Sequence, residues 1–180
     1  MGRSLEAASA IPHGAGRWQA DQLSILACPP PAIFHLEGRR DAASDATLPA
    51  PGRCISDRAG LLLSVGPEVY FRVGGENDCA TPCARFQLVV DVSSAWTHLA
   101  FEGTKAVALL RKGCAVDLHP RTFPAGACCV TGFARMRVVL WRSSVEARYE
   151  MLVGRSYALS LWSWLIEAAA PYGSQQTKEA

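Results

Sequence analysis

Short β-rich runs, punctuated by glycine and proline turns, follow one another through most of this chain, and only two segments have the pattern of helices. The expected strands are Leu23–Ala27, Ala32–Glu37, Leu61–Val65, Val69–Val73, Phe86–Val92, Trp96–Phe101 and segments near residues 128–133, 137–141 and 149–153. Runs of strands with few helices predict an α+β fold built from antiparallel sheets, and they argue against a doubly wound α/β fold.

The length of 180 residues fits one domain of ordinary size. Residues 1–20 are small and glycine-rich and show no periodicity, so we expect a mobile or partner-bound tail there. Residues 21–170 are expected to form a single compact α+β domain, with two lobes at 21–85 and 86–170 as the alternative. Residues 171–180 are expected to form a second tail.

The charge content of the chain limits the classes of function. Charged residues make up 19% of the chain, against ~25% in an average soluble domain, which indicates a permanent protein partner. The net charge of +2 is small and the basic residues are not clustered, so a protein that coats nucleic acid is not expected. No apolar run reaches the ~20 residues of a membrane-spanning helix and the first residues do not resemble a secretory signal, so the expected location is the cytoplasm, without a membrane partner.

The first expected helix begins near Gly103 and ends at Gly113. Its apolar stripe has helical spacing and consists of Ala106, Leu109 and Leu110. Glycine is the residue that most often takes the left-handed conformation after the last helical turn. We therefore expect Gly113 to adopt that conformation.

The last expected helix begins at about Ser156 and is apolar over most of its circumference. Its narrow polar stripe consists of Ser156, Ser160, Ser163 and Glu167. Trp162 and Trp164 point about 160° apart, because two residues of helix turn the chain by about 200°, so one core surface cannot cover both. Two explanations remain open, burial between two layers of the same domain and burial against another subunit. Under the second, one tryptophan is internal and the other lies at a subunit interface.

Covalent catalysis would need a thiol beside a base and an acid, and Cys114, Asp117 and His119 are the candidates. Cys114 follows the end of a helix, where the dipole disfavours a thiolate. Asp117, His119 and Arg121 alternate along a stretch expected to be extended, which places them on one side. We interpret these three as a local polar cluster or a polar contact to a partner or ligand, and we expect no catalytic residue in the chain.

Cofactor motifs are absent from the sequence. Neither the Gly-x-Gly-x-x-Gly fingerprint nor a Gly-x-x-x-x-Gly-Lys-Ser/Thr loop occurs, so no dinucleotide or nucleotide site is predicted. Cys79 and Cys83 form a lone Cys-x3-Cys pair without two further ligands, which leaves loop thiols or a redox pair as interpretations and argues against zinc. His13, His35 and His98 stand alone and are most simply surface or core histidines. We expect no cofactor and no metal in this chain.

Several stretches of the second half form a pattern that is known from one family. They are Asp91–Ser94, Phe101–Ala106, Leu110–Cys128, Val139–Arg142, Tyr149–Val153 and Leu161–Ile166. With these residues the chain resembles the gamma subunits of heterotetrameric sarcosine oxidases, densely over residues 86–168 and most specifically in the ungapped block 112–126. The first half resembles them loosely, over residues 62–73.

The resemblance implies a fold similar to the folate-binding region of the glycine-cleavage aminomethyltransferase, and a non-catalytic structural role beside alpha, beta and delta subunits. The partner subunits would carry FAD, FMN, NAD, zinc and tetrahydrofolate. The complex would demethylate sarcosine to glycine oxidatively, pass the one-carbon unit to tetrahydrofolate and form hydrogen peroxide. The interface residues expected in this chain are Asp117, His119, Arg121, Trp162 and Trp164.

Other functions remain open at this point. The equivalent subunit of a related complex, a dehydrogenase of another N-methyl amino acid, would have the same sequence features, because a different chain would recognise the substrate. A folate-binding aminomethyltransferase-like protein would share the fold, although this chain is about half the length of that family and lacks its Asp-rich folate motif. A stand-alone binding module is the third alternative.

Overall fold

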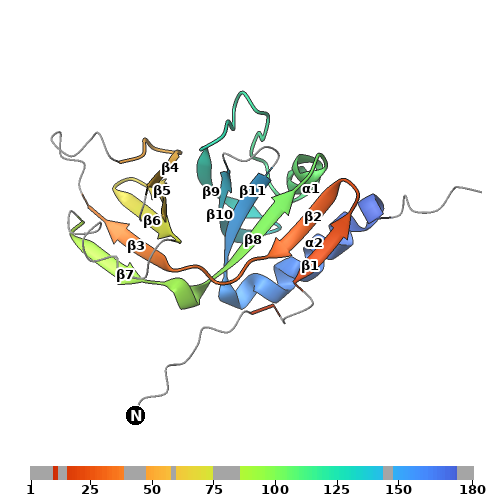
Figure 1. Cartoon of the computed structure of the whole chain (residues 1–180), viewed down its shortest axis with the longest axis horizontal. Coiled ribbons are helices and arrows are strands. Elements are labelled where there is room, and N and C mark those ends of the chain that lie inside the picture. The colour runs from red at the N-terminus through yellow and green to blue at the C-terminus, as the bar shows by residue number, and fades with distance from the viewer. Residues whose placement is uncertain are drawn as a thin grey trace, which may run out of the picture.

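The structure is a computed structural model, and it describes residues 10–11, 16–38, 48–57, 60–74, 86–143 and 148–173. Figure 1 shows the described residues as two antiparallel sheets side by side, with two helices against one of them. The Cys79 and Cys83 pair and His13, on which the sequence raised expectations, lie outside the described residues. Neither helix in the described part of the chain has the length and apolar character needed to cross a bilayer.

The larger sheet, called sheet A here, has six strands among the described residues. Every neighbouring pair in it is antiparallel. In spatial order the strands are β1 (Arg17–Ala20), β2 (Leu23–Ala27), β8 (Trp96–Glu102), β11 (Arg148–Gly154), β10 (Met136–Arg142) and β9 (Cys128–Phe133).

The smaller sheet, sheet B, has five strands in the part of the chain that the structure describes, and these strands also pair in antiparallel fashion. In spatial order they are β4 (Cys54–Asp57), β5 (Gly60–Gly66), β6 (Val69–Val73), β3 (Ile33–Glu37) and β7 (Leu88–Asp91). The predicted α+β class with antiparallel sheets and few helices is therefore confirmed.

The chain passes between the two sheets more than once. β2 and β3 are consecutive but lie in different sheets, and so do β7 and β8, which the short 3-10 turn Ser93–Ala95 joins. A division into lobes at residues 85 and 86 does not describe this arrangement, because each sheet takes strands from both sides of that point. The N-terminal tail expected over residues 1–20 is also too long, since Arg17–Ala20 pairs with β2.

Both helices pack on one face of sheet A (Figure 1). They are α1 (Ala106–Gly113) and α2 (Ala158–Gly173), the latter preceded by the 3-10 turn Arg155–Tyr157. The side chains that form this core are fully buried and include Ile25, Leu99, Phe101, Leu109, Leu140, Met151, Leu161 and Leu165. Successive side chains of β8 point to opposite faces of sheet A. Leu99 and Phe101 face the helices, so His98 faces the opposite way, towards sheet B.

Gly113 ends α1 for a different reason from the predicted one. It has no positive φ, and the residue after it, Cys114, is extended with φ −135°. A Cβ atom at Gly113 would instead collide with the ring of Phe133, which lies at the end of β9. Glycine is needed here because an aromatic ring packs directly against the helix backbone.

A second apolar cluster lies between the two sheets. Sheet B contributes Ile33, Leu63, Phe71 and Val73, and sheet A contributes Cys128, Val139, Trp141 and Leu152. The far side of sheet B has its own smaller cluster, which includes Leu36, Leu62, Tyr70 and Phe86. Sheet A is therefore covered on both faces.

Candidate functional site

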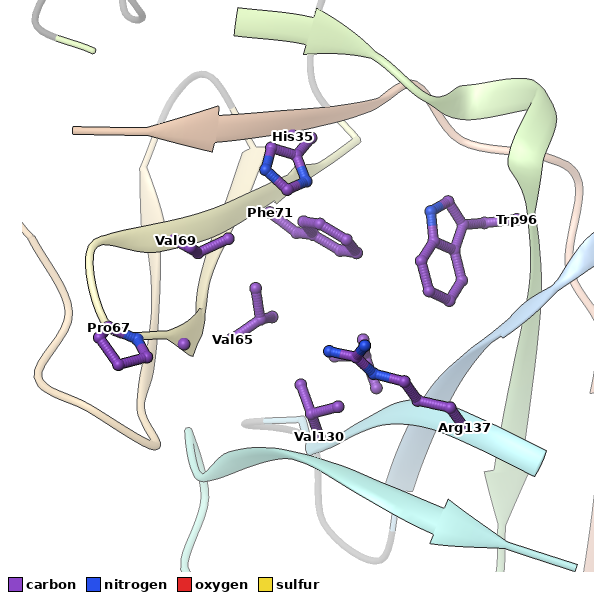
Figure 2. A pocket seen from close by; sticks show the side chains of 10 residues that line it. His35, Val65, Pro67, Val69, Phe71, Trp96, Val130 and Arg137 are labelled. Atoms are coloured by element: carbon purple, nitrogen blue, oxygen red, sulfur yellow. The ribbon is translucent and has the colours of Figure 1, made fainter. Parts of the chain in front are cut away.

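Two cavities lie between the sheets. One, of about 590 Å³, is bordered by His98, Trp141 and Glu150 from sheet A and by Cys54 and Ser56 from sheet B. The other, of about 500 Å³, is mostly apolar and is lined by aromatic and valine side chains, with Arg137 at its edge (Figure 2). A volume of this size is typical of sites for small ligands.

Four charged side chains form one network, and we call them the His98 cluster: His98, Glu150, Arg148 and Glu102. Two of them, His98 and Glu150, line the larger cavity. His98 Nε2 is 2.7 Å from Glu150 Oε2, and Arg148 Nε donates to Glu150 Oε1 at 3.0 Å. Arg148 also pairs with Glu102 at 2.5 Å. The strand register produces this arrangement, because Arg148 pairs with Glu102 and Glu150 with Ala100, two residues from His98.

Burial and ion pairing compete within the His98 cluster. Burial alone lowers the pKa of His98, but its side-chain contacts with Cys28 and Glu150 outweigh burial and raise the pKa to about 9. Burial would raise the pKa of Glu150, but the hydrogen bond from His98 and the charges of His98 and Arg148 lower it overall. At neutral pH the cluster therefore contains two cations and two carboxylates, and its charges balance internally.

The His98 cluster is suited to holding strands together and not to proton transfer. The ring of His98 stacks on Trp141, with centroids 5.5 Å apart and an angle of 18° between the planes, which fixes the imidazole in place. A general base works best with a pKa near the working pH, and His98 is far above that range. The nearby thiols stay protonated at neutral pH, because burial raises the pKa of Cys54 to about 11 and that of Cys128 to about 12.

The three polar residues predicted to alternate on an extended stretch instead lie at a turn. The Asp117 carboxylate accepts a hydrogen bond from the His119 N–H at 3.0 Å, and His119 Nδ1 accepts one from the Arg121 N–H at 3.2 Å. Arg121 therefore lies in a turn that begins at His119, and the side chains of Asp117 and His119 accept hydrogen bonds from the backbone that follows them. All three are exposed, and the hydrogen bond from His119 lowers the pKa of Asp117.

The candidate nucleophile Cys114 points to its own helix. Its thiol donates to the carbonyl oxygen of Leu110 at 3.5 Å, and burial raises its pKa. Within the described residues its sulfur makes no hydrogen bond with His119 or Asp117, so these side chains do not form a catalytic triad. The described residues also contain no group of three or more histidine, cysteine or acidic side chains placed to hold a metal ion.

The two tryptophans of α2 have different surroundings, as their spacing predicts. Trp162 is 8% exposed and belongs to the core under sheet A. Trp164 is half-buried, and its ring meets the edge of Phe133 with centroids 5.3 Å apart. Tyr157, in the turn before α2, and Leu159, at the start of α2, are each 55% exposed. The sequence pattern did not identify them as interface candidates. Among the five residues predicted to form an interface, Trp162 thus has almost no surface to offer a partner.

Comparison with known proteins places this architecture in a family. The profile of the sarcosine oxidase gamma subunit family matches residues 58–171. The gamma subunit of sarcosine oxidase from Corynebacterium sp. (strain U-96) is 31% identical over 143 residues, which make up 75% of this chain and 69% of that one. The chain belongs to the sarcosine oxidase gamma subunit family. A gamma subunit from Arthrobacter sp. is 34% identical over 86 residues, or 48% of this chain and 42% of the relative.

Solved structures agree with the family assignment. A chain of the heterotetrameric sarcosine oxidase from Corynebacterium sp. U-96 aligns with a TM-score of 0.77 and 25% identity, covering 91% of this chain and 92% of that chain. The glycine cleavage aminomethyltransferase T of Bartonella henselae aligns with a TM-score of 0.58 and 16% identity, covering 81% of this chain and 45% of that one. The second likeness concerns the fold alone, and it confirms the predicted aminomethyltransferase-like architecture.

The His98 cluster was missed because each of its residues looked unremarkable alone. The available signal was the presence of His98 and Glu150 inside strands that are otherwise apolar, Trp96–Phe101 and Tyr149–Val153. A charged residue at an inward position of a buried strand needs a partner, because an unpaired buried charge is very costly. That argument would have predicted a pair without saying which strands are neighbours.

Proposed function

We propose that this chain is a non-catalytic structural subunit of a heterotetrameric sarcosine oxidase, working beside alpha, beta and delta subunits in the cytoplasm. The observation that carries the proposal is the structural match to a chain of such an oxidase over 91% of this chain and 92% of the other. Agreement over nearly the whole of both chains supports an equivalent place in an equivalent complex. The complex would demethylate sarcosine to glycine oxidatively, transfer the one-carbon unit to tetrahydrofolate and form hydrogen peroxide.

The chemistry of the described residues supports a structural role. The buried charges pair with one another in the His98 cluster, the buried thiols are held in the protonated form, and the exposed Asp117 and His119 cap their own turn. These groups are engaged in holding the fold together. FAD, FMN, NAD, zinc and tetrahydrofolate are accordingly assigned to the partner subunits in this proposal.

The likeness to aminomethyltransferase T bears on the folate-binding alternative. The alignment covers 45% of that protein, so this chain corresponds to less than half of it. A chain that corresponds to less than half of the transferase would lack part of any folate site that extends over the whole of that protein. We therefore favour the oxidase subunit over a folate-dependent transferase.

Purification with and without partner chains tests the proposal. Expressed alone, the chain should be colourless and hold neither flavin nor stoichiometric metal. Expressed together with candidate partner chains of the same organism, it should co-purify in a yellow complex that oxidises sarcosine and releases peroxide. Flavin absorbance or about one zinc ion per chain in the isolated protein would contradict the proposal. A stable complex that oxidises a different N-methyl amino acid in preference to sarcosine would assign the chain to a sister complex.

Replacing His119 by alanine tests the non-catalytic role directly. We expect turnover of the assembled complex to stay within about tenfold of the unmodified complex, because losing a general acid or base usually costs about 10²–10⁴-fold. Steady-state kinetics on complexes with full flavin content would measure this. His119→Asn is the control, because asparagine can still accept the Arg121 N–H and preserve the turn. A loss beyond about a hundredfold in both variants would make this residue part of the chemistry.

A further inference from the structure

The smaller cavity has one aromatic wall and one aliphatic wall. His35, Phe71 and Trp96 form a row of rings, with centroids 5.5 Å apart for the first pair and 5.3 Å for the second. Figure 2 shows this row facing valine side chains that come from both sheets. The valines that line the cavity are Val65, Val69, Val130 and Val139. An occupant would therefore contact sheets A and B at once.

Arg137 brings a positive charge to this apolar space. It projects from β10, and Figure 2 shows its guanidinium extending between Val65 and Trp96. Among the described residues no carboxylate pairs with Arg137 and no acceptor is bonded to it. Glu37 is the acid that contacts a residue of the cavity wall, and its Oε1 lies 2.9 Å from His35 Nε2. The cavity thus combines an apolar interior with one unpaired cation at its edge.

We propose that this cavity binds a small amphipathic carboxylate, a molecule with an apolar or aromatic body and one anionic group. The body would fit between the aromatic row and the valines, where burial of apolar surface favours binding. The carboxylate would pair with Arg137, whose planar guanidinium matches a carboxylate through two parallel hydrogen bonds. The site uses only residues of this chain and does not depend on the structural role proposed above.

The His98 cluster makes the larger cavity a weaker candidate for the same ligand. The cations that line it are His98 and Arg142. His98 already pairs with Glu150, which also lines the cavity and would repel a carboxylate, and Arg142 Nη1 donates to the carbonyl oxygen of Phe123 at 3.2 Å. Arg137 has no such competitor among the described residues. The difference in charge pairing, and not the difference in volume, selects the smaller cavity.

Binding of 4-phenylbutanoate to the full chain tests the proposal, with 4-phenylbutanamide as the neutral analogue of the same shape. Trp96 lies in the cavity wall, so titration should change the tryptophan fluorescence in a saturable way and raise the unfolding temperature. We expect a Kd of about 1 mM or tighter for the acid and binding at least about tenfold weaker for the amide. Absence of saturable binding of the acid up to about 10 mM, or equal affinities for acid and amide, would overturn the proposal.

Three variants locate the site. Arg137→Gln should reduce acid binding to the level of the amide, and Arg137 is exposed, so the change should spare the fold. Arg135→Gln is the matched control, because it removes the same charge from the same hairpin at a residue outside the cavity wall, and it should bind like the unmodified chain. Val130→Phe should fill the cavity and abolish binding of both probes. Unchanged acid binding in Arg137→Gln, or an equal loss in Arg135→Gln, would refute the assignment.

Discussion

Replacing Trp162 by alanine should cost the free chain about 3–5 kcal/mol of unfolding free energy, which is a large part of the ~5–15 kcal/mol that stabilises a typical domain. Trp162 is 8% exposed and packs in the core between α2 and sheet A, so its removal leaves a cavity that the rigid sheet cannot close. Trp164→Ala should cost clearly less in the free chain, because Trp164 is half-buried and packs on Phe133 at the edge of the core. Its main effect should be weaker association with partner subunits.

Thermal unfolding of the free chain and co-purification with partner chains would separate the two effects. Ser163→Ala is the control between the two tryptophans, since Ser163 is exposed and its change should alter neither measurement. An interfacial tryptophan can contribute 2 kcal/mol or more to association. Equal destabilisation of the free chain by both tryptophan variants, or unchanged assembly in Trp164→Ala, would show that α2 does not join two surfaces.

The behaviour of α2 shows what periodicity can and cannot predict. The separation of about 160° between Trp162 and Trp164 follows from helix geometry alone, and so does the exposure of the stripe that contains Ser160 and Glu167. Which tryptophan is internal depends on where sheet A lies relative to the helix, and that is a tertiary fact. The exposed Tyr157 could not be foreseen either, because the turn before the helix is 3-10 and rotates that side chain away from the core.

The strands were predictable where an apolar run marks them. β2 and β6 match the predicted runs Leu23–Ala27 and Val69–Val73 residue for residue, because apolar side chains mark them clearly. β7 is a four-residue edge strand without a buried residue, and its Leu and Val residues still placed it inside a predicted run. β1 and β4 are edge strands of the same length and were not predicted, since polar residues interrupt their short sequences. β1 and β4 form strands because they pair with β2 and β5, and their own sequences do not indicate this pairing.

Register explains why the His98 cluster could not be predicted in full. His98 and Glu150 are 52 residues apart, and they meet because β8 pairs with β11 in one particular alignment. A shift of one residue in that pairing would turn either side chain to the other face of the sheet. The sequence contains the two polar residues, but their pairing depends on which strands become neighbours.

Replacing Glu150 by glutamine should cost about 3 kcal/mol of unfolding free energy, because it leaves His98 and Arg148 buried or half-buried without the carboxylate that links them. Glu102→Gln is the matched control with the same chemical change in the same cluster. Glu102 is 39% exposed and Glu150 is 14% exposed, so the control should cost about 1 kcal/mol or less. Chemical denaturation at neutral pH would measure both, and equal costs would show that the buried pair has no special role.

The same cluster makes the stability of the chain depend on pH in a window that can be stated. The pKa of His98 is raised from its usual 6.5 to about 9. Between these two pH values the folded state keeps the His98 proton, whereas the unfolded state has released it. Its stabilising effect is complete below pH 6.5 and should disappear as the pH rises through 9, a fall on the order of 3 kcal/mol. The buried thiols also make stability fall as the pH rises, but only above pH 9.0, because burial raises their pKa from that value. In Glu150→Gln the fall between pH 6.5 and 9 should become shallower, and an unchanged slope in that variant would mean that another group holds the proton.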